Sequence, residues 1–258
     1  MTSHQPRVLD LFRLDGKVAV VTGAGSGLGA GFARALAEAG ADIVIAGRRP
    51  AQLEATADAV TAIGRRCLSV PTDVTDPAQC RALVAAGVEA FGHVDALINN
   101  AGVANVVPAS IESPADFRAV VDVNLHGAFW MAQACAEVMR ADSSIVNVSS
   151  MLGLIKSNLP QAAYAASKAG LIGLTRDLSA QWAGRKGIRV NAIAPGFVDT
   201  EMTHDMPAET MAGFLAGCTL GRTGSQREID TAIVFLASPA SSYITGSTLA
   251  IDGGTSGH

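Results

Sequence analysis

Short apolar runs of three to five residues recur along the chain and alternate with longer stretches of helical pattern. In most of these runs the apolar residues occupy successive positions rather than every second one, which is typical of strands buried on both faces. Strands of that kind form parallel sheets, and a helix usually connects each strand to the next. The runs lie at residues 18–21, 43–45, 67–70, 96–98, 144–148, 188–191 and 248–251.

Helices are predicted in the gaps between these runs, and local signals mark several of their ends. Asp76 and Ser113 are of the residue types that cap helix starts, and a proline follows each of them. Gly40 and Gly64 stand where two helices should end. The predicted helices cover residues 28–39, 51–63, 77–91, 114–140, 161–183, 201–216 and 226–237. The whole pattern predicts an α/β protein: a doubly wound Rossmann fold with a parallel sheet of about seven strands, helices on both faces and a ligand site at the carboxyl ends of the strands.

The chain has 258 residues without a change of composition along its length, so we expect one domain over residues 1–258, with residues 1–14 as an N-terminal extension. Apolar residues make up 49% of the chain and charged residues only 16%, so other copies of the chain are expected to cover part of its surface. The net charge of −4 and the scattered basic residues argue against a nucleic-acid partner.

Three features predict a soluble, cytoplasmic protein. The first ten residues are polar and lack the apolar core of a signal peptide. No apolar run reaches membrane-spanning length without Gly, Pro or a charge, so no membrane partner is expected. The four cysteines show neither disulfide nor metal-ligand spacing, so they are expected to be reduced and no metal site is predicted.

A glycine-rich turn directly follows the first apolar run, where residues 22–29 read T-G-A-G-S-G-L-G and lead into a helix. Glycines allow a sharp turn and a close approach to a pyrophosphate, and the helix start offers free N–H groups and a positive dipole end. The spacing is T-G-x-x-x-G-x-G rather than G-x-G-x-x-G. In this strand–helix context the turn predicts dinucleotide binding, although such a turn can also be purely structural. The expected contacts come from Gly23, Ser26, Gly27, Leu28 and Gly29.

The second strand candidate ends without the acidic residue that would hold the adenosine ribose of NAD. Arg48 and Arg49 follow it instead. Arginine can hold a 2′-phosphate through two hydrogen bonds, so NADP(H) is the favoured cofactor, with Arg48 on the phosphate and NAD(H) as the alternative. The other interpretation is a solvated pair of loop arginines.

Tyr164 and Lys168 stand four residues apart in an alanine-rich stretch without a helix breaker. On a helix this spacing places both side chains on one face, one turn apart. An ammonium favours the phenolate, so Lys168 is expected to lower the pKa of Tyr164 toward the range of an acid/base catalyst. The chain holds only two tyrosines and four lysines, which makes a chance pairing less frequent. The structural alternative is an amphipathic helix on which the two residues have no joint role.

Further segments accompany the turn and the pair in a definite order. N-N-A-G follows the fourth strand at 99–102, Asn124 lies within a predicted helix, S-S ends the fifth strand at 149–150, and P-G-F-V-D-T follows the sixth at 195–200. With these segments the chain resembles, from Gly16 to Gly254, the short form of the short-chain dehydrogenase/reductase family.

The resemblance implies a catalytic set of Asn124, Ser150, Tyr164 and Lys168. Tyr164 would be the general acid/base that exchanges a proton with the substrate oxygen, and the Ser150 hydroxyl would hydrogen-bond that same oxygen. Lys168 would bind the nicotinamide ribose and keep the pKa of the tyrosine low. Asn124 would bend its helix and help to hold a water that leads protons away from the lysine. Taken alone, a serine that ends a strand is often only a turn cap, and Asn124 could be a surface asparagine.

The resemblance also implies further contacts with the cofactor. Asp73 and Val74 match the segment at the adenine ring, residues 100–102 the segment beside its ribose, and residues 195–200 the loop that anchors the nicotinamide carboxamide. Asp73 has a structural alternative as a cap of the helix near residue 77. The residues concerned are Asp73, Val74, Asn100, Ala101, Gly102, Pro195, Gly196, Val198 and Thr200, with Tyr164 and Lys168 at the nicotinamide.

Two features depart from the family pattern or fall outside it. Ser26 stands where many NADP-using relatives carry a lysine or arginine, which weakens the preference for NADP(H). Lys156 lies between the catalytic serine and tyrosine and should border the substrate. It is expected to recognise an acidic or polyhydroxylated substrate, or else to be a solvated loop residue.

The resemblance implies an NAD(P)(H)-dependent oxidoreductase that transfers a hydride reversibly between the nicotinamide and a carbonyl or secondary alcohol of a small molecule. Selectivity is expected in residues 200–222, a methionine-rich segment that would fold over the site as a lid. Sugar-acid dehydrogenases and 3-oxoacyl thioester reductases of the family look equally similar. The spacing of Tyr164 and Lys168 disfavours an enoyl reductase, and the length of the chain disfavours an extended-form sugar epimerase. A nucleotide sensor or scaffold that has lost turnover is the remaining alternative.

Family members are mostly homotetramers, so a homotetramer is expected here. Its interfaces would be formed by the two long helices predicted at 114–140 and 161–183, and by the last strand with its helix. The low content of charged residues agrees with such an assembly.

Overall fold

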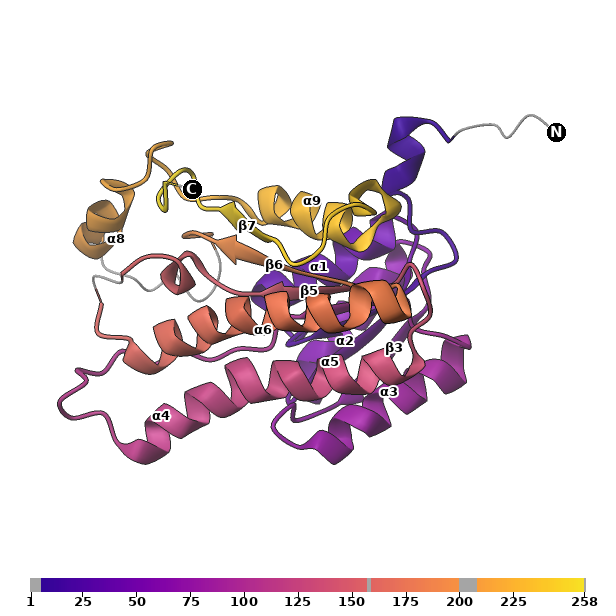
Figure 1. The fold of residues 1–258 in the computed structure, drawn as a ribbon, viewed down its shortest axis with the longest axis horizontal. Coiled ribbons are helices and arrows are strands. Elements are labelled where there is room, and N and C mark those ends of the chain that lie inside the picture. Colours follow the sequence, from indigo (N-terminus) through magenta and orange to yellow (C-terminus); the bar gives the residue numbers. More distant parts are fainter. Residues whose placement is uncertain (1–5, 157–158, 200–207, 258) are drawn as a thin grey trace.

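The computed structural model of the chain describes residues 6–156, 159–199 and 208–257. These residues form one sheet of seven strands in the order β3-β2-β1-β4-β5-β6-β7, and all neighbouring strands are parallel (Figure 1). The strands are β1 (Val18–Thr22), β2 (Asp42–Gly47), β3 (Cys67–Pro71), β4 (Ala96–Asn99), β5 (Ser144–Val148), β6 (Arg189–Pro195) and β7 (Thr248–Ile251). The predicted doubly wound parallel sheet is confirmed.

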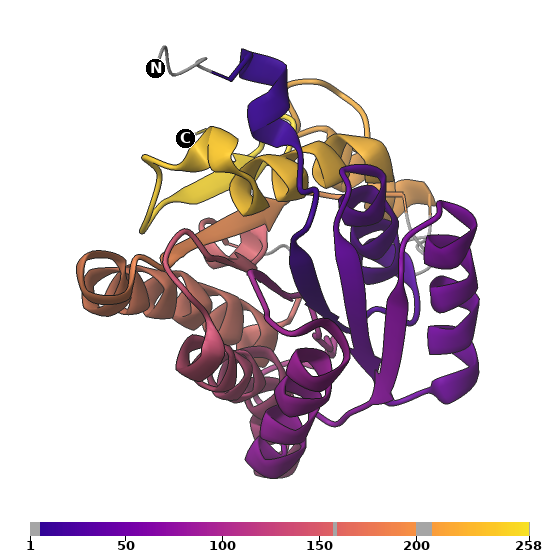
Figure 2. The same cartoon turned by 90° about the vertical axis from the view of Figure 1, so that its right-hand side faces the viewer.

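Helices cover both faces of the sheet, as Figure 2 shows. Alternate residues of the central strands enter two separate apolar clusters, because successive side chains of a strand point to opposite faces. One cluster packs the sheet against α1 (Gly27–Glu38), α2 (Pro50–Ala62) and α9 (Gln226–Ala237). The other packs it against α3 (Pro77–Phe91), α5 (Gly127–Val138) and α6 (Ala162–Lys186).

The helix predicted over residues 114–140 is not continuous, which corrects the expectation. It consists of α4 (Pro114–Val121), a π-helical turn η2 (Asp122–His126) and α5, and it ends two residues earlier than predicted. Asn124 lies at the centre of the π-helical turn and is buried, with 1% of its surface exposed. The irregularity expected at Asn124 is therefore present, as a wider turn within the helix.

The capping residues act where the sequence predicts them. The Asp76 carboxylate accepts hydrogen bonds from the N–H groups of Ala78 and Gln79, and the Ser113 hydroxyl accepts one from the N–H of Asp116. Each of these bonds satisfies a backbone donor in the first turn of a helix, which has no partner within the helix. Gly40 has a φ of 112°, a conformation that favours glycine.

The structure describes only part of the N-terminal extension and part of the predicted lid. In the N-terminal extension a short 3-10 helix, η1 (Val8–Phe12), packs through Phe12 onto Phe235 of α9, with ring centroids 5.9 Å apart. In the predicted lid the structure describes α8 (Ala208–Leu215) and the residues after it, whereas residues 200–207 lie outside the described part. No helix among the described residues is long and apolar enough to span a membrane.

Candidate active site

The glycine turn between β1 and α1 is built for close backbone contacts. A Cβ on Gly29 would collide with the carbonyl oxygen of Gly23, and a Cβ on Gly23 would lie 2.8 Å from the Cα of Ala101. Gly27, by contrast, has a φ of 53° and nothing within 4 Å of the place of a Cβ. The turn thus packs tightly on its inner side and leaves open space at the start of α1.

Ser26 is the N-cap of α1, but its side chain makes no capping hydrogen bond. Ser26 thus leaves the first N–H groups of the helix uncapped, and an anionic group is suited to this place. Leu28, in the first turn, packs its half-buried side chain against the core. These features fit the pyrophosphate of a dinucleotide.

Thr22, which the sequence analysis missed, links the turn to the loop after β4. Its hydroxyl accepts hydrogen bonds from the N–H groups of Asn100 and Ala101, both at 3.0 Å. The Asn100 amide in turn donates to the carbonyl oxygens of Thr22 and Gly23, at 3.0 and 3.2 Å. The only sequence signal for this role was a hydroxyl residue placed directly before the first glycine of the turn.

The two arginines after β2 lie at the edge of the same turn. Arg48 is exposed directly after the strand, which is compatible with a phosphate contact and with a solvated loop residue. Arg49, for which no separate role was predicted, donates from Nη2 to the Ser26 hydroxyl at 3.3 Å. Ser26 and a guanidinium therefore meet here, although Ser26 departs from the family pattern.

Asp73 and Val74 follow the end of β3. The Asp73 carboxylate accepts hydrogen bonds from the N–H and the hydroxyl of Thr75, at 3.0 and 2.8 Å, and Asp76 is the residue that caps α3. Val74 is buried against Gly127 of α5. A Cβ placed on Gly127 would lie only 2.6 Å from the Val74 side chain. The structure thus excludes the alternative role of Asp73 as the helix cap.

Tyr164 and Ser150 meet although they are 14 positions apart in the sequence. Tyr164 lies in the first turn of α6, and a side-chain hydrogen bond joins it to Ser150, which follows β5. Burial raises the pKa of Tyr164, and the hydrogen bond with Ser150 opposes that rise. Ser150 also caps the short 3-10 helix η3 (Met151–Gly153) by accepting from the N–H of Leu152 at 3.1 Å, so the turn cap considered for this serine is present, and its contact with the substrate oxygen stays a prediction.

Lys168 lies one turn further along α6, as the spacing predicts, but its effect on the tyrosine differs from the expectation. Its Nζ donates to the carbonyl oxygen of Val148 at 2.7 Å and lies 5.6 Å from the centroid of the Tyr164 ring. Burial lowers the pKa of Lys168 to about 8. The predicted lowering of the Tyr164 pKa by this lysine is wrong for this structure, because burial raises that pKa and the opposing influence is the hydrogen bond with Ser150.

Asn124 connects three parts of the site. Its Oδ1 accepts from the N–H of Val103 at 2.8 Å, and its Nδ2 donates to the Val103 carbonyl oxygen at 2.9 Å and to the Ser167 hydroxyl at 3.0 Å. A Cβ on Gly102 would lie 3.4 Å from both Asn124 Oδ1 and Lys168 Nζ. The π-helical turn, the loop after β4 and α6 therefore converge beside the lysine.

The loop after β6 packs against the end of β7. The N–H of Gly196 donates to the carbonyl oxygen of Ile251 at 2.9 Å, and a Cβ on Gly196 would lie 2.7 Å from the Cα of Asp252. Pro195 ends β6 and Val198 is buried. Thr200 and the first part of the predicted lid lie outside the described residues.

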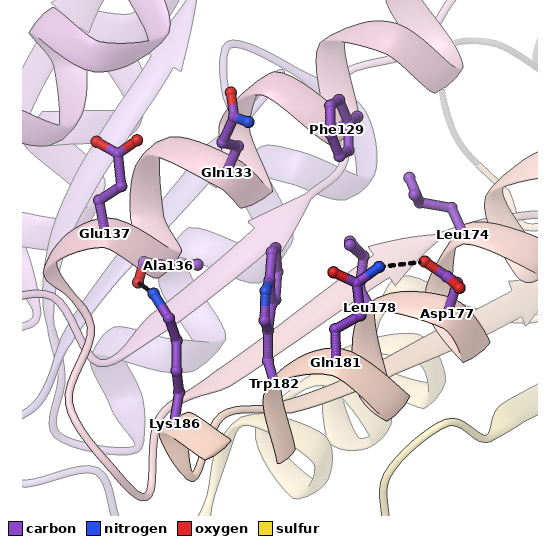
Figure 3. A pocket seen from close by; sticks show the side chains of 10 residues that line it. All are labelled: Phe129, Gln133, Ala136, Glu137, Leu174, Asp177, Leu178, Gln181, Trp182 and Lys186. Atoms are coloured by element: carbon purple, nitrogen blue, oxygen red, sulfur yellow. Dashed lines mark hydrogen bonds between the residues drawn. The ribbon is translucent and has the colours of Figure 1, made fainter. Parts of the chain in front are cut away.

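A separate groove of about 480 Å³ runs between α5 and α6, on the outer side of these helices. Figure 3 shows Phe129 of α5 and Leu174 and Trp182 of α6 among the side chains that line it. None of the predicted catalytic or cofactor-binding residues lines this groove. It is therefore a different surface from the edge of the sheet where those residues gather.

Comparisons with known proteins found relatives that match most of the chain. A family model described as "Enoyl-(Acyl carrier protein) reductase" matches residues 23–256. A galactitol 2-dehydrogenase (L-tagatose-forming) of Cereibacter sphaeroides is 45% identical over 95% of this chain and 96% of its own length. The 3-oxoacyl-[acyl-carrier-protein] reductase of Thermotoga maritima is 39% identical over 94% of this chain and 98% of its own.

A solved structure from Agrobacterium tumefaciens, proposed to be a 2-deoxy-D-gluconate 3-dehydrogenase, was determined with bound NADP. It is 35% identical to this chain and superposes with a TM-score of 0.88. The match covers 99% of that structure's chain and 96% of this one. Because the family model spans most of the chain and the relatives cover nearly all of it, this protein belongs to the short-chain dehydrogenase/reductase family of NAD(P)-dependent oxidoreductases.

Proposed function

We propose that this one-domain enzyme (residues 1–258) interconverts a carbonyl and a secondary alcohol with Tyr164 as its general acid/base. The observation that carries the proposal is the hydrogen bond between Tyr164 and Ser150, with Lys168 one turn away on α6. It brings two hydroxyl groups to one place, where both can reach the oxygen of a substrate. The nicotinamide, when bound, donates or accepts the hydride.

The residues of this chain then have distinct tasks. During reduction the Tyr164 hydroxyl gives its proton to the substrate oxygen as negative charge develops there, and the Ser150 hydroxyl donates a second hydrogen bond to the same oxygen. Lys168 holds the cofactor ribose and supplies a positive charge beside the phenolate that forms. Asn124 keeps the loop after β4 in contact with α6 through its three hydrogen bonds.

The Tyr164→Phe variant tests this proposal. Loss of the hydroxyl removes the proton donor, so we expect kcat to fall by about 10²–10⁴-fold while the cofactor still binds. The Tyr243→Phe variant is the matched control, because Tyr243 is the other tyrosine of the chain and is fully exposed. Equal turnover by the two variants would exclude Tyr164 as the acid/base. The absence of any turnover in the unmodified protein would favour a silent sensor or scaffold.

For the cofactor, we propose a preference for NADP(H) over NAD(H). The end of β2 offers two guanidiniums and no carboxylate, and Arg49 is hydrogen-bonded to Ser26 at the glycine turn. A fluorescence titration should find tighter binding of NADPH than of NADH. Arg48→Asp should reverse that order, since a carboxylate repels a 2′-phosphate and accepts from a 2′-hydroxyl.

For the substrate, we propose a polyhydroxylated alcohol or sugar acid, with a 3-oxoacyl thioester as the second candidate. The polyol candidate is supported by the 45% identity with a galactitol dehydrogenase, and the thioester by the 39% identity with an acyl-carrier-protein reductase. Lys156 is exposed after η3, in the segment that leads to Tyr164. Lys156→Ala should raise the KM for an acidic or polyhydroxylated substrate and leave cofactor binding intact.

We further propose that the enzyme is a cytoplasmic homotetramer. Support comes from the groove between α5 and α6, whose wall contains two aromatic side chains, and from β7, an edge strand whose Leu249 is 40% exposed. Both are surfaces at which another copy of the chain could pack. The four cysteines, all unpaired, agree with a reducing compartment.

A further inference from the structure

Gln52, in the first turn of α2, has an amide oxygen without a hydrogen-bond partner beside the glycine turn. Its Oε1 is buried and makes no hydrogen bond with any described residue. A Cβ placed on Gly25 would lie 3.2 Å from the Cβ of Gln52 and 3.4 Å from that Oε1. The side chain of Gln52 therefore stands against the face of the turn that Gly25 leaves bare.

The packing of α2 holds Gln52 in this place. The Thr56 hydroxyl donates to the carbonyl oxygen of Ala24 in the glycine turn at 2.8 Å, which ties the helix to the turn. Leu53, the next residue, is fully buried, and its side chain lies 3.3 Å from the place that a Cβ on Gly47 would take. Gln52 thus lies on a rigid element, at a fixed distance from the turn.

A buried acceptor without a donor destabilises a protein, and such groups call for an explanation. The end of β2 reads Gly47-Arg48-Arg49, so it has no carboxylate to accept a hydrogen bond from a ribose hydroxyl. Gln52 Oε1 is an acceptor at the same edge of the turn. A ribose hydroxyl is a donor of the kind that this oxygen lacks.

We propose that Gln52 is a specificity-determining residue for the dinucleotide: its amide oxygen accepts a hydrogen bond from an adenosine-ribose hydroxyl, and its lack of charge leaves room for a 2′-phosphate beside Arg48 and Arg49. This inference rests on the proposed use of NADP(H). It assigns to Gln52 the contact with the ribose and to the arginines the contact with the phosphate.

Equilibrium dissociation constants of NADPH and NADH test the assignment, measured by nucleotide fluorescence on the purified full chain. Gln52→Ala removes the acceptor and should weaken both nucleotides by a similar factor, about 3–10-fold. Gln52→Glu keeps an acceptor but adds a negative charge. It should weaken NADPH by about tenfold or more and leave NADH unchanged or tighter.

Ala55→Glu is the matched control, since Ala55 is exposed on the same helix one turn further on and receives the same charge. Thermal unfolding of each variant verifies that it is folded, and Gln52→Met, which also removes the amide acceptor, replaces Gln52→Ala if the latter does not fold. Unchanged constants for Gln52→Ala, or an equal loss of NADPH affinity in Ala55→Glu, would overturn the assignment. If the unmodified chain binds neither nucleotide, the proposed function fails and this inference falls with it.

Discussion

Lys168 places an ammonium inside the protein, with only 4% of the residue exposed. Its Nζ has a carbonyl oxygen as hydrogen-bond acceptor, and burial alone accounts for its lowered pKa. A buried cation of this kind is costly for the folded state unless a negative or strongly polar partner faces it. The place beside it is where the Tyr164 phenolate and the hydroxyls of a cofactor ribose would supply such partners.

The pKa of Lys168 predicts how stability depends on pH. Because the pKa falls from 10.5 in the unfolded chain to about 8 in the folded one, the unfolded state binds more protons between these values. The contribution of this lysine to the free energy of unfolding therefore rises as the pH rises from about 8. The Lys168→Met variant lacks this rise. Its free energy of unfolding, relative to that of the unmodified protein, should therefore decline by about 1–2 kcal/mol between pH 7.5 and 9.5.

Urea denaturation of both proteins across this range measures the difference. The pH range ends below the titration of Tyr164, because the pKa of this tyrosine is raised. At higher pH its ionisation would lower the free energy of unfolding and oppose the effect of Lys168. Lys186→Met is the control for removal of a cation from the same helix. A relative stability that does not change with pH would contradict the lowered pKa of Lys168.

For single residues, the sequence predicted the contact within one helix but missed several contacts between segments that are far apart in the chain. Tyr164 and Lys168 were predictable because a spacing of four defines a helix face. The contacts of Thr22, Arg49 and Gln52 join segments that only the folded sheet brings together, as in the bond from Arg49 to Ser26, 23 residues apart. The pKa of Tyr164 was predicted with the wrong sign because spacing carries no information on burial.

Among the secondary-structure elements, the π-helical turn η2 has the most direct bearing on the site. It widens the helix at Asn124, whose amide holds both backbone polar groups of Val103 and the hydroxyl of Ser167. Without that amide, the N–H and carbonyl of Val103 would lose their partner. The turn thus couples the position of the loop after β4 to that of α6.

Asn124→Ala should therefore lower the free energy of unfolding by about 2–4 kcal/mol, since two or more polar groups lose a buried partner. We also expect lower kcat, because the loop after β4 and α6, which carries Lys168, lose the bonds that join them through Asn124. Asn105→Ala is the control, as Asn105 is half-buried and donates to Glu112 alone among the described side chains, at 2.8 Å. Its loss should be about 1 kcal/mol. Equal urea midpoints for the two variants would refute the structural role of Asn124.

The limits of prediction differ between helix ends and helix interiors. Asp76 and Ser113 cap their helices as predicted, because a cap depends on neighbouring residues only. The break at η2 was not visible as a boundary, since the apolar pattern runs on through Val121, Val123 and Leu125. The family resemblance, rather than the local pattern, indicated that Asn124 disturbs this helix.

For the whole molecule, the alternation of apolar runs and helices was sufficient to predict the sheet. Every run became a strand, although β6 continues to Pro195, four residues beyond the predicted end. The strands at the two edges are less buried than the central ones, as β3 and β7 show. Low charge content predicted a covered surface without its location, whereas the family resemblance placed it at the two long helices, between which the groove of α5 and α6 lies.

A charge placed in this groove tests the proposed assembly. Leu174 lines it from α6, so Leu174→Glu should split the tetramer into smaller species by burying an unpaired carboxylate. Ala180→Glu puts the same charge on an exposed position of the same helix outside the groove and should leave the assembly intact. Light scattering coupled to gel filtration gives the masses. A monomeric unmodified protein, or a Leu174→Glu tetramer, would contradict the proposal.

The central claim is that Tyr164 exchanges protons once the cofactor is in place, and the ionisation of this phenol tests it most directly. In the Tyr243→Phe variant Tyr164 is the only tyrosine, so ultraviolet difference spectra report its titration alone. The account predicts a pKa above the ordinary phenol value of about 10 without nucleotide and clearly below it with oxidised NADP bound. A phenol pKa that stays above 10 in the saturated complex would contradict it.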